Sequence, residues 1–378
     1  MQEKKTIKKA EFIKKIIQKQ GPVPFIRFME ICLYDEDAGY YSTGEHPVGK
    51  KGDFVTGPST PLFGALIANQ IREFRSLLEK DHMTIVEMGA GSAILARDLL
   101  EHLDRKEGDR FRYVIVEPFD TVRSFQKCIL GPMAERVMWI ETLDELTFSP
   151  DCFLSNELID AFPVHLVQKG DTGFQEVHVC LNDNGELQEC LRDITEETLQ
   201  DYVSGLPTYL PIGYRTEVNL RMKTWIQKIA SLMHRGFIFT IDYGFSAKDY
   251  FHPARNRGTL LSYKDHAVRE NVLLDPGDQD ITAHVNFSDL HRWGEEAGLV
   301  TLGFAPQWSF LASLDFEKTF YEMSGGKFDP FSPMLAGVKM LILPQGMGET
   351  HKVLVQAKGM DANTELMGFR MRNIRKKL

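Results

Sequence analysis

Two glycines follow an apolar stretch in residues 85–92, which read IVEMGAGS. This order predicts a buried strand, a tight turn and then a helix, so that a ligand can approach the backbone at the helix N-terminus. Ile94 stands where the dinucleotide fingerprint has a third glycine or alanine, and no phosphate-binding lysine follows. The Glu87 carboxylate near the turn favours a cationic ligand over a phosphate. A purely structural glycine turn is the alternative interpretation.

A second acidic residue, Glu117, ends the apolar stretch at residues 114–117. A carboxylate at this place can accept two hydrogen bonds from ribose hydroxyls, although a solvated strand end is the alternative. Together the two acids and the turn offer partners to an ammonium, a sulfonium and a ribose. We therefore expect S-adenosylmethionine as the cofactor. The residues assigned to it are Glu87, Gly89, Ala90, Gly91, Glu117 and Asn156.

Asn156 and Glu157 directly follow the apolar residues 152–155, and Asp160 comes three residues later. Ligands of open α/β sheets bind outside the carboxyl ends of the strands. A guanidinium stays protonated at neutral pH, and a pair of carboxylates can hold it through two hydrogen bonds while orienting one nitrogen for methyl transfer. Glu157 and Asp160 are therefore candidate catalytic residues. The alternative is a helix N-cap, with Asn156 capping and Glu157 near the helix dipole.

Other polar and aromatic residues are expected around the same crevice. Asp242 follows the apolar strand at residues 237–241, and a long loop at residues 35–61 carries aromatic and acidic residues toward a lid or substrate wall. His284, within residues 277–285, could orient the acceptor or take a proton and is the third candidate catalytic residue, although an isolated histidine is more often structural. The residues assigned to the substrate are Tyr40, Tyr41, Asp53, Phe54 and Asp242.

The elements that must position these residues alternate along the chain. Apolar strands at residues 84–88, 112–117, 137–140 and 152–155 are separated by helices at 92–103 and 120–130, which predicts an α/β fold with a parallel sheet. Alternation from residue 164 to 191, with an Asn184-Gly185 turn, predicts an inserted β-rich subdomain. A helix from about residue 216 to 234 then leads back to the sheet.

Four units are expected from this pattern. Residues 1–80 form an N-terminal helical extension and substrate-covering loop, and residues 81–163 with 236–360 form the Rossmann-like domain. The inserted subdomain occupies residues 164–235, and a basic tail occupies residues 361–378. Amphipathic periodicity at residues 5–19 and a helix from Pro24 to Tyr34 support the helical extension.

Composition narrows the class of protein. The 378 residues carry a net charge of −9, which argues against a nucleic-acid binder because phosphate contacts need clustered Lys and Arg. The five widely spaced cysteines predict neither disulfides nor a metal site. No membrane-spanning stretch and no signal peptide is expected, so we predict a cytoplasmic protein of unknown oligomeric state, with a mature organellar form as the alternative.

Taken together, these segments resemble the MidA-like family of methyltransferases, which includes the mitochondrial complex I assembly-factor arginine methyltransferase. The resemblance lies in residues 28–30, 33–35, 39–41, 49–56, 62–64, 87–91, 117–118, 156–163, 241–244, 258–260 and 280–287. It implies a class I methyltransferase fold of seven mostly parallel strands, with an N-terminal extension and an insertion after the fourth strand. It also implies a protein substrate and an arginine acceptor. The motif residues carried over are Glu87, Gly89, Gly91 and Glu117 for the cofactor, and Asn156, Glu157 and Asp160 for the acceptor.

Two departures from the family pattern keep alternatives open. Residues 57–61 read GPSTP where many members have a Pro-Glu step, and Asn286 stands where aspartate is usual. If the missing glutamate holds an acceptor, the departure at Ser59 puts the substrate and even activity in doubt. The alternatives are a methyltransferase for another nitrogen acceptor, in a small molecule or nucleic acid, and a non-catalytic cofactor-binding assembly factor.

Overall fold

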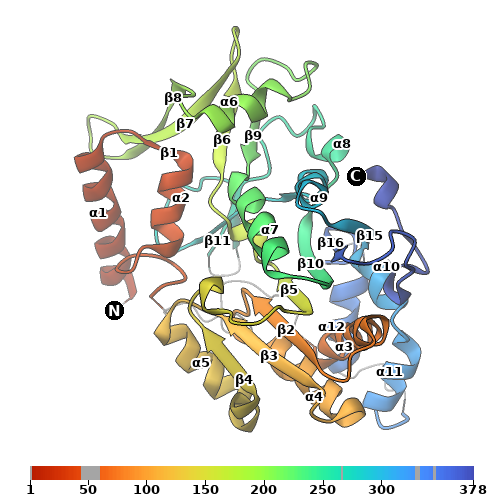
Figure 1. The fold of residues 1–378 in the computed structure, drawn as a ribbon. Helices are drawn as coiled ribbons and strands as arrows, with labels where there is room; N and C mark the ends of the chain where they lie inside the picture. The colour runs from red at the N-terminus through yellow and green to blue at the C-terminus, as the bar shows by residue number, and fades with distance from the viewer. Residues whose placement is uncertain (1, 44–59, 265–266, 328–332, 344–345) are drawn as a thin grey trace.

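The computed structural model describes residues 2–43, 60–264, 267–327, 333–343 and 346–378, and it is built around one central sheet (Figure 1). Its strands lie in the order β15-β16-β10-β5-β2-β3-β4. Neighbours from β10 to β4 pair in parallel, whereas β16 runs antiparallel to β10 and β15. The bounds are β2 (Met83–Met88), β3 (Phe111–Val116), β4 (Val137–Ile140), β5 (Cys152–Asn156), β10 (Gly236–Phe245), β15 (Val300–Pro306) and β16 (His351–Lys358). The predicted α/β class and mostly parallel sheet are confirmed.

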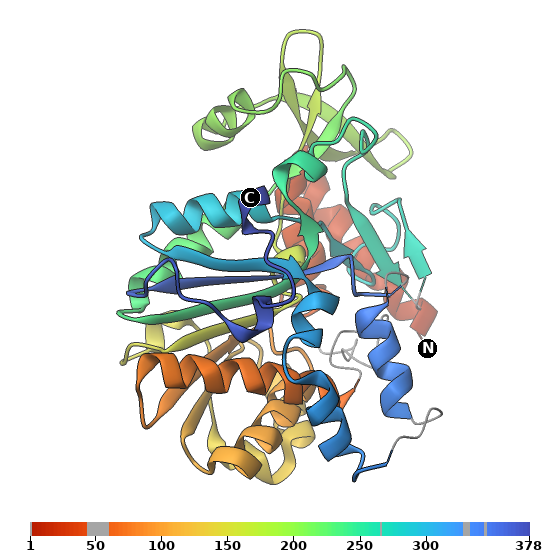
Figure 2. The ribbon, with the colours of Figure 1, turned by 90° about the vertical axis from the view of Figure 1, so that its right-hand side faces the viewer.

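Both faces of this sheet are covered, as parallel strands with continuous apolar runs require. Ile85 on β2 packs into one core with α3 (Pro61–Leu78) and α4 (Ile94–Glu107). The next residue, Val86, points to the other face and packs with α7 (Leu220–Leu232) and α9 (Phe287–Glu296). Figure 2 shows α3 and α9 on opposite sides of the sheet. The helix α5 (Asp120–Leu130) connects β3 to β4.

The inserted subdomain is an antiparallel sheet that projects from the central one (Figure 1). It contains β6 (His165–Lys169), β7 (Phe174–Leu181), β8 (Leu187–Asp193) and β9 (Arg215–Val218), with α6 (Glu197–Ser204) between the last two. The predicted hairpin is confirmed, because Leu181 pairs with Leu187 and Gly185 turns the chain at φ 73°.

The N-terminal extension joins this inserted sheet. The extension consists of α1 (Gln2–Gln20), β1 (Val23–Pro24) and α2 (Phe25–Tyr34), and β1 pairs antiparallel with β7. Phe25 and Phe28 of α2 share a buried core with Val177 and Val179 of β7. Two units that are far apart in sequence therefore form one body beside the sheet.

The structure corrects several sequence-based boundaries. Residues 215–218 are strand β9 rather than the start of a helix, because Asn219 caps α7 by accepting a hydrogen bond from the Met222 N–H at 2.9 Å. The helices α3 and α7, assigned from sequence to the extension and the insertion, pack on the central sheet. The basic segment 361–378 is docked rather than a free tail: Phe369 is buried, and the Ile374 N–H donates to the Phe304 carbonyl at 2.7 Å.

Shorter elements complete the fold. Residues 246–285 contain α8 (Ala247–Tyr250) and a small sheet of β11 (Leu261–Lys264), β12 (Ala267–Arg269) and β13 (Asp280–Thr282). The strand β14 (Val285–Asn286) pairs with the end of β10, and α10 (Gln307–Ala312), α11 (Phe316–Met323) and α12 (Pro333–Ile342) lie between β15 and β16. In the described parts of the chain, no helix has the length and apolar character needed to span a bilayer.

Candidate active site

A cavity of about 880 Å³ lies at the carboxyl ends of β2, β3, β4 and β5, where ligands of open α/β sheets bind. Each of these strand ends contributes an acidic or glycine residue to its wall: Gly89, Glu117, Glu141 and Glu157. Tyr34 and Tyr41 from the N-terminal extension also line it. The volume falls within the range of about 300–1,000 Å³ typical of small-molecule sites.

The glycine turn after β2 has a backbone that only glycine adopts easily. Gly89 has φ 74° and Gly91 has φ 51°. A Cβ atom at Gly89 would lie 2.8 Å from Cδ1 of Leu158, so a larger residue there would push into the cavity wall. The turn thus leaves its main chain exposed to a ligand at the start of α4, as the sequence predicts.

Glu87 is an almost fully buried carboxylate beside this turn, with 1% of its surface exposed. The Tyr113 hydroxyl donates a hydrogen bond to its Oε2 at 2.9 Å. Burial raises the pKa of Glu87 to about 7, although the Tyr113 hydrogen bond acts in the opposite direction. A cationic ligand in the cavity would favour the ionised form of this carboxyl group.

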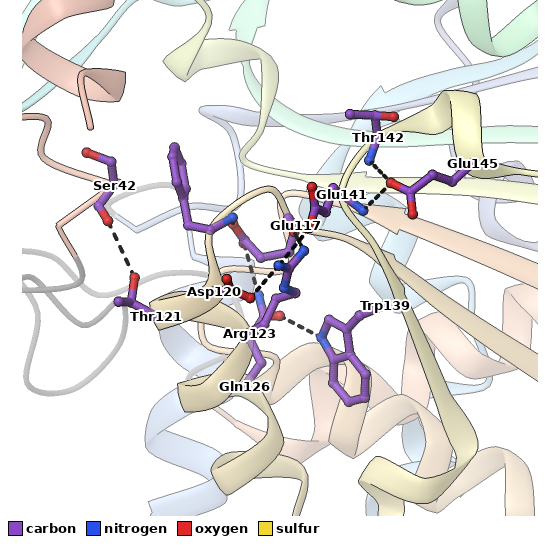
Figure 3. Close-up of polar contacts among 11 residues, drawn as sticks. Ser42, Glu117, Asp120, Thr121, Arg123, Gln126, Trp139, Glu141, Thr142 and Glu145 are labelled. Atoms are coloured by element: carbon purple, nitrogen blue, oxygen red, sulfur yellow. Dashed lines mark hydrogen bonds and ion pairs between the residues drawn. The ribbon is translucent and has the colours of Figure 1, made fainter.

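Glu117 is held at the cavity wall by a buried network, shown in Figure 3. The Phe119 N–H donates to its Oε1 at 3.2 Å, and the Gln126 amide donates to its Oε2 at 3.2 Å. Burial raises the pKa of Glu117 to about 7 in spite of these bonds. The ribose-binding assignment made from sequence is thus compatible with a fixed carboxylate facing the cavity.

Gln126 is a residue that sequence reasoning missed. Its amide nitrogen also donates to the Gly91 carbonyl at 3.0 Å, and its oxygen accepts from the Trp139 indole at 2.9 Å (Figure 3). The side chain is fully buried. It therefore ties the glycine turn after β2 to the acid after β3, across the two strands.

The end of β4 adds two further residues that the sequence analysis did not assign. Glu141 and Thr142 line the cavity, and Arg123 links this strand end to its neighbour by donating to Glu141 at 3.1 Å and to the Glu117 carbonyl at 3.1 Å (Figure 3). The rule that ligands bind at carboxyl strand ends would have found Glu141, since it follows a predicted strand.

Asn156 and Glu157 lie where the sequence placed them, on the cavity wall after β5. The Asn156 amide donates to Glu157 Oε1 at 3.3 Å, whereas its Oδ1 is buried without a hydrogen-bond partner among the described residues. Glu157 has φ 51°, a conformation uncommon for a residue with a side chain. The helix-cap alternative is wrong, because Leu158 occupies the N-cap of the short turn that follows and no side chain caps it.

Asp160 also lines the cavity. Its Oδ2 accepts a hydrogen bond from the Tyr243 hydroxyl at 2.8 Å, and its Oδ1 is buried without a partner in the described structure. Burial raises the pKa of Asp160 to about 7, and the nearby Glu157 charge adds to the rise. An unpartnered buried oxygen is uncommon in folded proteins, which marks Asp160 as a candidate binding residue.

Asp242 lies behind this wall rather than on it, so the cavity does not reach the residue that the sequence assigned to substrate. It is fully buried, and its Oδ2 accepts from the Ile159 N–H at 2.9 Å. Its Oδ1 accepts from the Tyr243 N–H at 2.9 Å. Asp242 therefore fixes the backbone that carries Asp160, while burial holds its own pKa well above the usual range.

The two histidines near the site differ in position. His284 lies behind Tyr243, with ring centroids 5.0 Å apart, and is absent from the cavity wall. Burial and the charge of Arg255 lower the pKa of His284 to about 4. His351, at the start of β16, lies with its Nε2 3.7 Å from Glu157 Oε1. Sequence reasoning missed it, because no local pattern marks a histidine at the start of a distant strand.

The residues expected to form the substrate wall differ in their positions relative to the cavity. Tyr41 lines the cavity and donates from its hydroxyl to Asp280 at 2.7 Å. Tyr40 is 3% exposed and packs into the core shared with α2. Asp53 and Phe54 lie outside the described residues, as does the departure at Ser59.

The other departure, Asn286, has a structural role. It caps α9 by accepting from the Ser288 N–H at 3.2 Å and donates to Asp289 at 2.8 Å. It does not line the cavity. This substitution therefore leaves the wall of the site intact.

Comparison with known proteins identifies the family. The sequence pattern of a family described as S-adenosyl-L-methionine-dependent methyltransferases matches residues 66–305, well over half of the chain. The chain belongs to this family. The methyltransferase is also similar over its whole length to a crystal structure from Burkholderia thailandensis, described as a candidate methyl transferase bound to S-adenosyl-homocysteine. The TM-score is 0.90, with 31% identity and coverage of 99% and 98% of the two chains.

Named relatives extend the comparison. A Drosophila melanogaster protein named as a mitochondrial protein arginine methyltransferase NDUFAF7 homolog is 27% identical over 368 residues, covering 90% of this chain and 82% of the relative. The human protein of the corresponding name is 24% identical over 365 residues, covering 88% and 79%. Because these relatives are named as mitochondrial, the expectation of a cytoplasmic protein is wrong.

The described residues fit the cofactor of this family. The cavity wall offers the Gly89 main chain without a Cβ, the buried carboxylates Glu87 and Glu117, and the unpartnered Oδ1 of Asn156. These groups match a ligand that carries an ammonium, a sulfonium and a ribose. The chain is therefore an S-adenosylmethionine-dependent methyltransferase, as the sequence predicts.

Proposed function

We propose that this methyltransferase transfers a methyl group to a guanidinium nitrogen of an arginine in a protein substrate. The observation that carries the proposal is the pair Glu157 and Asp160, which line the same cavity as the glycine turn, with the buried Asp160 Oδ1 unpartnered in the described structure. A guanidinium has five N–H donors and a permanent charge, so it matches this pair. The names of the relatives support the same acceptor.

Charge along the cavity disfavours a nucleic-acid acceptor. Among the described lining residues, six are acidic, namely Glu87, Glu117, Glu141, Asp144, Glu157 and Asp160. Only Arg221 and Lys228 are basic among them. An acidic wall repels phosphates and attracts a cationic side chain, so it supports an arginine substrate over a polynucleotide.

S-adenosylmethionine, when bound, supplies a methyl group that its sulfonium makes electrophilic. In the proposed site, Glu87 would hold the ammonium, Glu117 would hold the ribose, and the main chain of residues 89–91 with Asn156 would complete the cofactor wall. Glu157 and Asp160 hold the guanidinium so that one nitrogen faces the methyl group, which lowers the entropic part of the barrier. Tyr34 and Tyr41 exclude water from the reacting groups.

The acceptor nitrogen must lose one proton for the methylated product to keep a single positive charge. Glu157 is our candidate for the proton acceptor, because His351 Nε2 lies 3.7 Å from its Oε1 and offers an onward partner. Tyr243 and Asp242 are positioning residues, since one donates to Asp160 and the other fixes its backbone. His284 acts through Tyr243 in this scheme rather than on the substrate.

The test is methyl transfer from isotopically labelled S-adenosylmethionine to synthetic peptides that contain arginine, with lysine peptides and free arginine as competitors. Mass spectrometry should place the label on a guanidinium. Glu157→Gln should lower turnover by about 100-fold or more, as expected for loss of a general base, with cofactor affinity changed less than threefold. Glu101→Gln, at an exposed position of α4, is the matched control. Label on lysine or on free arginine alone would contradict the proposal, and cofactor binding without any transfer would favour a non-catalytic role.

A further inference from the structure

A second cavity of about 420 Å³ lies at a different part of the fold. It is formed where α8, the end of β15, the start of β16 and the C-terminal segment meet, and it shares no lining residue with the active-site cavity. Its charged lining residues are the cations Arg255, Lys352, Arg372 and Lys377 and the carboxylates Asp249 and Glu349. The remaining lining residues include the half-buried aromatic residue Phe245.

Two of the four cations of this cavity, Arg255 and Lys352, donate to main-chain carbonyls. Arg255 lies 3.9 Å from the centroid of the Phe245 ring and donates to the main-chain carbonyl of Asp249. Lys352 donates to the main-chain carbonyl of Glu349. A carbonyl positions a cationic group without neutralising it, so both charges remain available to a ligand.

The two carboxylates are already engaged. Glu349 accepts from the Trp308 indole at 2.7 Å and lies 3.7 Å from Arg372, while Asp249 accepts from the Ser246 hydroxyl at 3.4 Å. With four cations and two carboxylates, the cavity carries a net charge of about +2 at neutral pH. The whole chain carries a net charge of −9, so this cavity is positive although the protein as a whole is negative.

The position of Lys352 in this cavity changes the pKa of its ammonium. Burial, together with the neighbouring charges of Arg372 and Lys377, lowers the pKa of its ammonium to about 8, against the opposing effects of Glu349 and Asp249. An anion in the cavity would relieve the repulsion between these cations. A phosphate monoester carries a charge between about −1.5 and −2 near pH 7 and has three acceptor oxygens.

We propose that this cavity binds the phosphate group of a small soluble phosphate monoester, with Lys352, Arg255 and Arg372 as its ligands and the Phe245 side chain beside the organic part. The proposal does not depend on the acceptor assigned to the active site. It adds a binding site beside the end of β10 and the start of β16, with no lining residue in common with the methyl-transfer cavity.

Isothermal titration calorimetry with inorganic phosphate and with phenyl phosphate tests the proposal on the full chain. Both should bind the wild type, with phenyl phosphate tighter because of the Phe245 ring. Lys352→Met and Arg372→Leu should each weaken phosphate binding at least tenfold. Lys358→Met is the matched control, because Lys358 lies at the other end of β16 and donates to the Ala230 carbonyl outside the cavity.

Every variant should bind S-adenosylhomocysteine as the wild type does, which shows that it is folded. Equal phosphate affinity in wild type and Lys352→Met, or no binding at 10 mM phosphate, would overturn the proposal. Citrate binding as tightly as phosphate would also overturn it, since the site would then select charge rather than a phosphate group. Failure of methyl transfer in the earlier assay would leave these outcomes unchanged.

Discussion

At the scale of single residues, the active-site cavity is lined by carboxyl groups whose pKa values are raised by burial. Glu87, Glu117 and Asp160 each have a pKa raised to about 7. Their folded pKa values exceed their unfolded values, so the stability that their neutral forms contribute is present below about pH 4.5 and is lost as pH rises through 7. A bound cation offsets this loss, which links ligand binding to pH.

We predict that cofactor affinity rises about tenfold between pH 6 and pH 8, because the Glu87 carboxyl must be ionised to accept an ammonium group. Calorimetry with S-adenosylhomocysteine at several pH values measures this. Glu87→Gln should bind more weakly and show a flatter profile. A wild-type affinity that falls over the same range would contradict the assigned role.

Gln126 gives a second prediction at this scale. Gln126→Leu removes the donor to Glu117 and to the Gly91 carbonyl, and we expect about tenfold weaker cofactor binding and a loss of about 1–3 kcal/mol in unfolding free energy. Trp139→Phe removes only the outer partner of the amide and should leave affinity within about threefold. Equal losses in the two variants would show that the network acts only through packing.

At the scale of elements, the turn between β2 and α4 is the proposed place of approach for the cofactor. Its conformation is local, since positive φ values at Gly89 and Gly91 follow from the glycines themselves. The space around the turn is not set locally, because a Cβ at Gly89 would meet Leu158, which follows β5. The parallel pairing of β2 with β5 brings the two segments together.

Gly89→Ala should therefore weaken cofactor binding at least tenfold and destabilise the fold by about 1–3 kcal/mol, from backbone strain plus the contact with Leu158. Gly108→Ala is the matched control, since its φ of 68° imposes similar strain but a Cβ there meets open space. Thermal unfolding and calorimetry compare the two. If Gly108→Ala costs as much affinity as Gly89→Ala, the steric argument fails.

At the scale of the whole molecule, the N-terminal extension and the inserted sheet share one core, and Tyr34 and Tyr41 of the extension reach the cavity. The pairing of β1 with β7 fixes this arrangement. In the proposed site, the acceptor side therefore depends partly on packing outside the central sheet, whereas the residues assigned to the cofactor follow strands of that sheet.

Phe25→Ala should lower the unfolding free energy by about 3–5 kcal/mol, because its ring is fully buried between α2 and the inserted sheet. We expect KM for an acceptor peptide to rise more than the Kd for S-adenosylhomocysteine. Phe12→Ala changes a ring on α1 that is 37% exposed, and it should change both this KM and this Kd less than twofold. A larger effect on the Kd for S-adenosylhomocysteine than on the KM for the peptide would contradict the assignment of the extension to the acceptor side.

The sequence by itself determined the alternation of strands and helices, the glycine turn, and the acids at strand ends. These follow from local periodicity and turn chemistry, and parallel pairing then places the strand ends at one edge. Only the tertiary structure decided that Gln126 joins two strand ends, that His351 rather than His284 lies beside Glu157, and that Asp242 holds backbone behind the wall. The physical reason is that these contacts join segments 35–194 residues apart, and their register depends on how whole elements pack.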